Sequence, residues 1–235
     1  MASTKPKVVD IHTHMYPPSY IDILTSRTAI PVVRTFPQAA DPRLILLDAE
    51  QQALDAALQD PTAKPPGRPL TSHYASLDQK IHFMDTHSID ISVVSLANPW
   101  LDFIEPKEAA ATARSVNDEF EAICILHDGQ LVAEGKVGAA RRTIWDVLRE
   151  QVYLDAVIYS EIGLKAAIAA SGGADRLMFG TDHPFFPPLG TDEQSTWESV
   201  TWNAEAVSKA VGKGSEEADG IMGGNAIRLL RLETV

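Results

Sequence analysis

The segment Val8–His14, with the sequence VVDIHTH, limits the possible folds and functions of this chain more than any other segment does. Its apolar residues predict a buried strand that ends in two histidines separated by one residue. Alternate residues of a strand point to the same face, so His12 and His14 can direct both imidazoles at one point, as a divalent metal requires. Asp10 shares that face and is expected to hydrogen-bond a ligating histidine. A pair of exposed strand-end histidines is the alternative, and the motif alone does not decide.

A second strand that ends in a polar side chain is expected near the other end of the chain. The segment Arg176–Asp182 has the sequence RLMFGTD, so a buried strand is predicted to deliver a carboxylate. Carboxylate oxygens and imidazole nitrogens are both ligands that zinc accepts in proteins. The second motif therefore favours a metal site over exposed histidines.

Length and charge limit the possible classes of protein. The chain has 235 residues, which fits one large domain, and a single α/β barrel of about 250 residues is the natural upper case. Its net charge of −12 argues against nucleic acid and anionic membranes as partners. No apolar run approaches the ~20 residues that span a bilayer, and the first residues lack the apolar core of a signal peptide. The single cysteine, Cys124, fits a reducing compartment, and the cytoplasm is expected.

Hydrophobic periodicity and capping residues predict alternating strands and helices. Further strands are expected at 89–96 and 153–158, and helices at 48–59, 76–87, 106–127, 143–151, 160–170, 195–211 and 225–232. The stretch 15–38 is expected to be a long irregular loop, with a small accessory hairpin formed by 32–36 and 43–47. The proline-rich segment 60–70 is expected to be neither helix nor central strand. The segment 130–142 is expected to be a polar connector, and Gly223–Gly224 a helix break.

These motifs resemble the amidohydrolase-related (type 2) family. The resemblance rests on His12–His14, on the strand end Gly180–Asp182 and on the closing segment Gly223–Ala226. Within the family the chain resembles the aminocarboxymuconate semialdehyde decarboxylase branch, and in most detail the fungal uracil-5-carboxylate (isoorotate) decarboxylases. The most similar segments are DIHTHMYPPSY at 10–20, SLANPW at 95–100, YLDAVIYS at 153–160 and the run 175–188. The resemblance covers 7–127 and 128–232.

The resemblance implies an α/β fold, a TIM-barrel-like (β/α)₈ domain over residues 1–235, with an N-terminal half at 7–127 and a C-terminal half at 128–235. Candidates exist for the first, second, seventh and eighth barrel strands only. The segment 97–151 is too short for four more βα units, which take roughly 30 residues each. The family's histidine motifs on the fifth and sixth strands have no counterpart in the sequence. Barrel strands 3–6 are therefore expected to be missing.

The resemblance also implies a site. His12, His14 and Asp182 would hold one divalent metal, usually Zn²⁺, and Asp182 would also be catalytic as a proton carrier. Arg68, Asn98 and Phe185 would bind the substrate, a small planar carboxylate, with Phe185 stacked on its ring. Three alternatives stay open at these positions, namely a solvated Arg68, a loop-closing Asn98 and a packing role for Phe185. The resemblance further implies a homodimer.

Three hypotheses about function follow from these observations. The first is a metal-dependent decarboxylase of a small cyclic or aromatic carboxylate such as uracil-5-carboxylate. The second is a metal-dependent hydrolase, such as a lactonase, that uses the same ligands to activate water. The third is a non-catalytic fragment, which the apparent loss of half the barrel supports. The motifs Asn98–Trp100 and Phe185–Pro188 favour the decarboxylase.

Overall fold

The computed structural model describes residues 6–125, 131–133, 152–188 and 196–232. It is an α/β structure with two compact units. The sheet unit comprises residues 1–14, 81–95 and 123–235, and the hairpin unit comprises 15–80 and 96–122. The expected helix at 143–151 and the last residues of the helix at 106–127 lie outside the described residues, as does most of the connector at 130–142.

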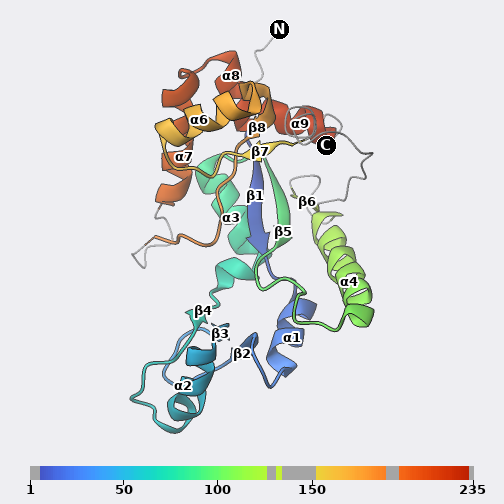
Figure 1. Ribbon diagram of the computed structural model, residues 1–235, viewed down its shortest axis with the longest axis vertical. Coiled ribbons are helices and arrows are strands. Elements are labelled where there is room, and N and C mark those ends of the chain that lie inside the picture. The colour runs from blue at the N-terminus through green and yellow to red at the C-terminus, as the bar shows by residue number, and fades with distance from the viewer. Residues whose placement is uncertain (1–5, 126–130, 134–151, 189–195, 233–235) are drawn as a thin grey trace. The chain divides into compact units, whose positions relative to one another are not determined.

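The sheet unit is built around β1 (Val9–Met15), which carries the two histidines of the motif (Figure 1). One sheet has the order β1-β5-β6, with β5 at Ile91–Leu96 and β6 at Leu131–Ala133. A second sheet pairs β7 (Leu154–Asp155) in parallel with β8 (Leu177–Met178). The residues after β8 run alongside β1 and form a parallel bridge between Thr13 and His183. The strands therefore follow one another in the order β7-β8-β1-β5-β6.

The strand β6 was not expected. It lies in the segment that the sequence predicted to be a polar connector, and it pairs in parallel with β5 from Ser92–Leu131 to Val94–Ala133. Its three residues, Leu-Val-Ala, are too few for a periodic pattern to stand out, so only the neighbouring β5 identifies them as a strand. The strand predicted at 153–158 is also shorter than expected, because its pairing with β8 covers only Leu154 and Asp155.

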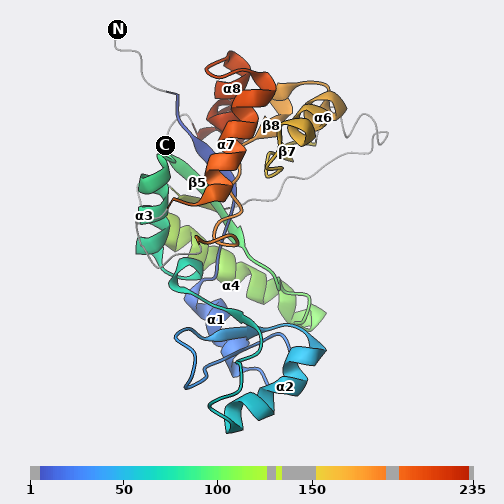
Figure 2. The ribbon, with the colours of Figure 1, turned by 90° about the vertical axis from the view of Figure 1, so that its left-hand side faces the viewer.

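Two helices pack beside β7 and β8, as Figures 1 and 2 show. They are α6 (Glu161–Ser171) and α7 (Glu198–Val211), and both were predicted within two or three residues. Ser160 begins α6 by accepting a hydrogen bond from the Gly163 amide at 3.1 Å, as an N-cap residue does. The core between these elements consists of Ala156, Leu164, Leu177, Val207, Ala218 and Ile221.

The expected helix break at Gly223–Gly224 was wrong. The chain continues from α8 (Glu216–Asp219) through a π-helix at Gly220–Gly224 into α9 (Asn225–Leu230) without leaving helical backbone angles. A Cβ atom on Gly223 would lie 1.9 Å from the carbonyl oxygen of Lys7. Gly223 is therefore needed because the chain just before β1 passes directly over this helix, and not because a helix ends there.

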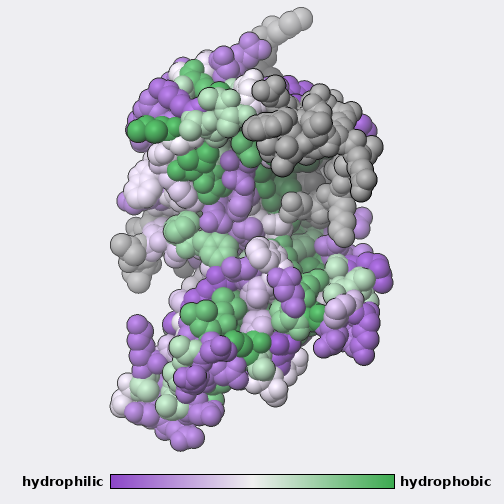
Figure 3. All heavy atoms as spheres, viewed as in Figure 1, coloured by the Kyte–Doolittle hydropathy of each residue, from purple (hydrophilic) through white to green (hydrophobic). Residues whose placement is uncertain are grey.

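The hairpin unit contains the accessory hairpin that the sequence predicted. Strand β2 (Val32–Arg34) pairs antiparallel with β3 (Arg43–Ile45), and β4 (Arg68–Pro69) adds an edge strand, where a proline is tolerated. The helix α2 (Asp48–Gln59) buries Leu54 and Ala57 against this hairpin. Its exposed residues are a mixture of charged and amide side chains with alanines and Leu58, and Figure 3 shows hydrophilic and hydrophobic spheres where α2 lies in Figure 1.

The first part of the expected irregular loop is a helix, which corrects that prediction. Helix α1 (Pro18–Ser26) has a proline in its first turn and buries Tyr20 and Leu24, which are four residues apart. A proline is tolerated at this position because the first amide of a helix has no partner within it. The two prolines of the motif MYPPSY suggested a loop. They instead lie at the start of a helix, with Pro17 just before it and Pro18 as its first residue.

Two further predicted helices are present, at α3 (Leu77–His87) and α4 (Pro106–Ile125). Ser76 accepts a hydrogen bond from the Gln79 amide at 3.3 Å, which is one of the two hydrogen bonds of a capping box. A short 3₁₀-helix, Ser72–Tyr74, precedes α3. Within the described part of the chain, every helix is too short or too polar to cross a bilayer.

Candidate metal centre

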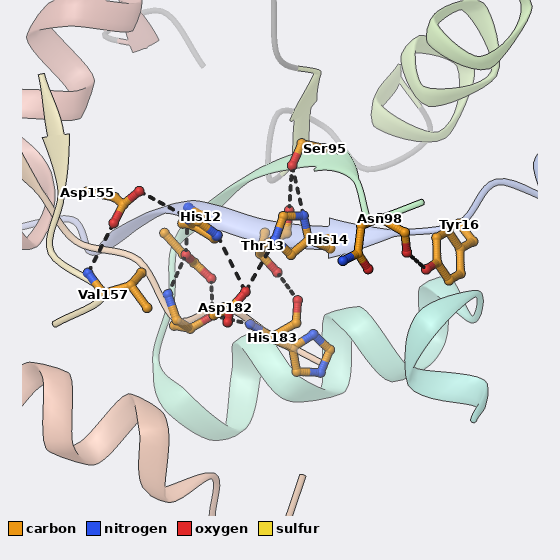
Figure 4. A network of polar contacts seen from close by, with 12 residues as sticks. His12, Thr13, His14, Tyr16, Ser95, Asn98, Asp155, Val157, Asp182 and His183 are labelled. Carbon is orange, nitrogen blue, oxygen red and sulfur yellow. Dashed lines mark hydrogen bonds and ion pairs between the residues drawn. The ribbon is translucent and has the colours of Figure 1, made fainter. Parts of the chain in front are cut away.

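The structure brings His12, His14 and Asp182 together in the sheet unit (Figure 4). One ligand atom from each residue lies within 4.8 Å of the other two. The Nε2 atoms of His12 and His14 lie 3.4 Å and 3.3 Å from the same oxygen, Oδ1 of Asp182. The three side chains are half-buried, so a small ion could enter from solvent while most of the surrounding volume is protein.

Strand pairing explains why residues so distant in sequence converge. The two histidines share one face of β1, and Thr13 between them faces the opposite side and is fully buried. The amide of Asp182 donates to the carbonyl oxygen of His12 at 2.8 Å. Asp182 has a positive φ of 56°, a left-handed conformation that aspartate adopts more readily than most residues. The chain therefore turns at Asp182, close to both imidazoles.

The spacing of these atoms suits a tetrahedral metal. Two ligands bound about 2.0–2.1 Å from a tetrahedral zinc ion lie about 3.3 Å from each other. The separations of 3.4 Å and 3.3 Å between the imidazole nitrogens and Asp182 Oδ1 match this value. Nitrogen and carboxylate oxygen are also the donor types of catalytic zinc sites, which use three protein ligands and leave one position open. The residues present therefore fit a divalent ion.

Each histidine has a hydrogen-bonding partner at its other ring nitrogen. Asp155 Oδ2 lies 2.9 Å from Nδ1 of His12, and Ser95 Oγ lies 3.0 Å from Nδ1 of His14. These contacts leave both Nε2 atoms directed at Asp182. The sequence interpretation missed both partners, although each sits in a segment predicted to be a strand. Their positions near the ends of strands that lead to the site were the available signal.

The electrostatics of the cluster follow from these contacts. The hydrogen bond to Asp155 and then the hydrogen bond to Asp182 raise the pKa of His12 to about 10. Burial raises the pKa of Asp182, but its hydrogen bonds to His12 and His14 outweigh burial and hold that pKa at about 2. The pKa of Asp155 is lowered, chiefly by the hydrogen bond to His12. Both carboxylates are therefore ionised at neutral pH, as a cation site requires.

Asp10 has a different role from the one its place in the strand suggested. Its fully buried carboxylate accepts hydrogen bonds from the Thr181 hydroxyl at 2.7 Å, the Thr181 amide at 3.1 Å and the His12 amide at 3.1 Å. The expected contact with a ligating histidine thus goes to the backbone of His12. The imidazole of His12 has Asp155 as its carboxylate partner instead. Asp10 fixes the two strand ends that carry the candidate ligands.

Phe185 also lies beside the cluster. Its ring centroid is 5.4 Å from that of His14, with the planes at 78°, so the two rings meet edge to face. Phe185 is half-buried, which leaves part of its ring exposed next to His14. Its stacking on a substrate stays a prediction.

The other two predicted substrate residues lie together in the hairpin unit. Nη2 of Arg68 donates to the carbonyl oxygen of Asn98 at 2.7 Å and to its Oδ1 at 3.2 Å. The same nitrogen donates to the hydroxyl of Tyr16 at 2.5 Å, and that hydroxyl donates to the Asn98 carbonyl (Figure 4). Burial raises the pKa of Tyr16 to about 12, so its hydroxyl stays protonated. Arg68 and Asn98 are therefore held in one network, and Tyr16 is a member that the sequence interpretation did not single out.

Comparison with solved structures identifies the relatives of this chain. It is 44% identical to IDCase, the isoorotate decarboxylase of Metarhizium anisopliae, with 99% of both chains covered and a TM-score of 0.88. The 5-carboxyvanillate decarboxylase LigW of Sphingomonas paucimobilis is 9% identical, covers 97% of this chain and 99% of its own, and has a TM-score of 0.60. The 2,6-dihydroxybenzoate decarboxylase of Rhizobium is 13% identical, with 97% and 100% covered and a TM-score of 0.56.

The two more distant structures show a shared fold alone. No family model and no curated protein matches the chain. The similarity to IDCase, in contrast, is high and extends over the whole length of both chains. Together with the His-x-His strand and the Gly180–Asp182 strand end, it shows that this chain belongs to the IDCase group of the amidohydrolase-type decarboxylases, a family of carboxy-lyases.

Proposed function

We propose that this chain is a metal-dependent, non-oxidative decarboxylase of a small planar carboxylate such as uracil-5-carboxylate, with Zn²⁺ bound by His12, His14 and Asp182. The observation that carries the proposal is the convergence of both Nε2 atoms on Asp182 Oδ1 at 3.4 Å and 3.3 Å. The substrate is inferred from IDCase, which is 44% identical to this chain.

Loss of carbon dioxide breaks the bond between the ring and its carboxylate and leaves an electron pair on the ring carbon, which must then receive a proton. A bound divalent ion would supply Lewis-acid stabilisation of substrate oxygens. The low pKa of Asp182, about 2, makes it an ionised ligand at neutral pH. Asp182 must therefore gain a proton before it can protonate the ring carbon as the general acid.

The remaining substrate residues are assigned by the same proposal. Phe185 lies next to His14, and its exposed part offers an apolar surface to a planar ring. Asn98 follows β5, the strand that carries Ser95, and Arg68 donates to Asn98 through one nitrogen. Guanidinium and amide groups recognise carboxylate and carbonyl oxygens, so Arg68 and Asn98 would bind the oxygen-rich edge of the substrate.

We also propose that the barrel is shortened and that the enzyme is a homodimer. Among the described residues, β6 pairs only with β5, and β7 pairs only with β8. Within that part of the chain, no further strand follows β6 or precedes β7 in the order β7-β8-β1-β5-β6. A complete (β/α)₈ barrel gives every strand two neighbours. The support for the dimer is membership of the family.

The test combines metal content with product analysis. Purified protein is dialysed, its zinc per chain is measured by elemental mass spectrometry, and it is then incubated with uracil-5-carboxylate. We expect about one zinc per chain and release of carbon dioxide in equal amount to uracil. A chelator should abolish the release, and added zinc should restore it.

The control is Glu205→Gln, which removes an exposed carboxylate that pairs with Lys209 at 2.8 Å and is not one of the proposed metal ligands. This variant should keep its zinc and its turnover. Ring opening of the substrate without carbon dioxide release would identify a hydrolase instead. A folded, monodisperse chain that binds no zinc and releases no carbon dioxide would be the non-catalytic fragment and would refute the proposal.

A further inference from the structure

We propose that Asp155 is the positioning residue of this site, because it sets which nitrogen of His12 is free to bind the metal. The inference rests on the proposed function and adds to it a residue that touches neither metal nor substrate. It also predicts that the two histidine ligands are not equivalent, since their partners differ in chemistry.

The geometry of Asp155 is fixed on both of its oxygens. Oδ2 lies 2.9 Å from Nδ1 of His12, and Oδ1 accepts a hydrogen bond from the Val157 amide at 3.3 Å. The backbone is fixed as well, because Asp155 pairs with Met178 in β7 and β8, and the next amide, of Ala156, donates to the Met178 carbonyl at 2.7 Å. The carboxylate is therefore presented to His12 in one orientation (Figure 4).

A carboxylate can only accept hydrogen bonds, so its contact with His12 requires a hydrogen on Nδ1. When His12 releases its second proton to bind a metal, the lone pair lies on Nε2, and Nε2 is the atom directed at Asp182 Oδ1. Without Asp155 the hydrogen could reside on either nitrogen, and the ring could also rotate. A metal would then bind only the fraction of molecules in which Nε2 is free and correctly placed.

The partner of His14 imposes the same choice less firmly. Ser95 Oγ lies 3.0 Å from Nδ1 of His14 and donates to the carbonyl oxygen of Thr13 at 3.4 Å, which leaves it to accept from Nδ1. The donated bond is long and the hydroxyl can rotate to donate to Nδ1 instead, so Ser95 fixes the tautomer of His14 less firmly than a carboxylate, which can only accept. Loss of the Asp155 carboxylate should therefore weaken the metal more than loss of the Ser95 hydroxyl.

The experiment measures the zinc dissociation constant by competition with a chromophoric chelator for the wild type and for Asp155→Ala, Asp155→Asn and Ser95→Ala. We expect Asp155→Ala to weaken zinc binding about 10- to 100-fold, the range found when such partners of metal-binding histidines are removed. Asp155→Asn should lose less, because its amide oxygen can still accept from Nδ1. Ser95→Ala should also lose less than Asp155→Ala.

A second readout reports the tautomer itself. In ¹⁵N NMR spectra of zinc-loaded protein, the His12 signals should show zinc on Nε2 and hydrogen on Nδ1 alone in the wild type, and zinc on either nitrogen in Asp155→Ala. The charge-matched control is Glu161→Gln, which removes an exposed carboxylate of α6 that pairs with Lys165 at 2.7 Å. Its zinc affinity should equal that of the wild type.

The outcomes separate this inference from the proposed function. If the wild type binds zinc and Asp155→Ala binds it equally well with an unchanged tautomer, Asp155 does not position His12 and only this inference fails. If Glu161→Gln weakens zinc binding as much as Asp155→Ala does, the loss comes from the change in net charge, and the positioning role of Asp155 is overturned as well. A wild type that binds no zinc overturns both the metal site and the role of Asp155.

Discussion

The buried carboxylate of Asp10 accepts a hydrogen bond from the buried hydroxyl of Thr181 at 2.7 Å, across 171 residues of sequence. The Thr181 amide donates to the same carboxylate at 3.1 Å. A polar group buried in protein needs such partners, because burial without them is costly. This contact joins the strand of the two histidines to the strand end of Asp182 before any metal is bound.

Thr181→Val removes that hydroxyl and keeps nearly the same shape. We expect it to lower the free energy of unfolding by about 1–3 kcal/mol, since a buried carboxyl oxygen loses the hydrogen bond that it accepted. Urea denaturation followed by circular dichroism measures the change. Thr86→Val is the control, because the Thr86 hydroxyl bonds a carbonyl of its own exposed helix turn at 2.8 Å. Equal stability losses in both variants would show that the contact with Asp10 stabilises the protein no more than the exposed hydrogen bond of Thr86 does.

Asp182→Asn tests the role of the carboxylate in the metal centre. An amide is a poor zinc ligand, and the change also removes the negative charge that faces both Nε2 atoms. We expect zinc per chain to fall well below the wild-type value and carbon dioxide release to be lost, while the far-ultraviolet circular dichroism spectrum stays unchanged. Wild-type turnover in this variant would exclude Asp182 from both assigned roles.

Two adjacent glycines near the C-terminus should respond differently to the same change. A Cβ on Gly223 would meet the Lys7 carbonyl oxygen at 1.9 Å, whereas the nearest atom to a Cβ on Gly224 lies at 3.5 Å. We expect Gly223→Ala to destabilise the protein strongly, because the backbone before β1 must move. Gly224→Ala should be tolerated or stabilising by up to about 1 kcal/mol, since alanine favours a helix over glycine. Thermal unfolding of both variants makes the comparison, and similar melting temperatures would contradict it.

His87 should make stability depend on pH. Its Nε2 accepts a hydrogen bond from the Trp197 amide at 3.2 Å, and burial lowers its pKa below the ordinary value of 6.5. The unfolded chain therefore takes up this proton at higher pH than the folded protein. The stabilisation is complete above pH 6.5 and is lost as the pH falls through the folded pKa.

The measurement compares the wild type with His87→Gln by urea denaturation at about pH 7.5 and pH 5.5, on either side of the ordinary histidine value. The glutamine amide oxygen can accept from Trp197 and does not titrate. The wild type should lose more stability than the variant on acidification. His12, with its pKa raised to about 10, makes the folded protein more stable on acidification, but it contributes this equally to the wild type and the variant. Parallel pH dependences would show that His87 is not the titrating group.

The sequence by itself determined the parts of this protein that local physics controls. The two-residue period of a strand placed His12 and His14 on one face, and the capping residue Ser160 predicted the start of α6. The composition of 48–59, which is rich in Ala, Leu and Gln, predicted α2 with its observed bounds. The motifs at both ends of the chain also identified the family, because each consists of residues close together in sequence.

Only the tertiary structure decided which side chains from distant segments meet. Strand β6 exists because β5 provides its hydrogen bonds, and Gly223 is required because residues near Lys7 pass over it. The partner of the His12 imidazole is Asp155 and not Asp10, although Asp10 is only two residues from His12. Strand pairing determines which residue is the partner, because β7 lies on one side of β8 and β1 lies beside the residues that follow β8. A local sequence pattern does not show which strands are neighbours in the sheet.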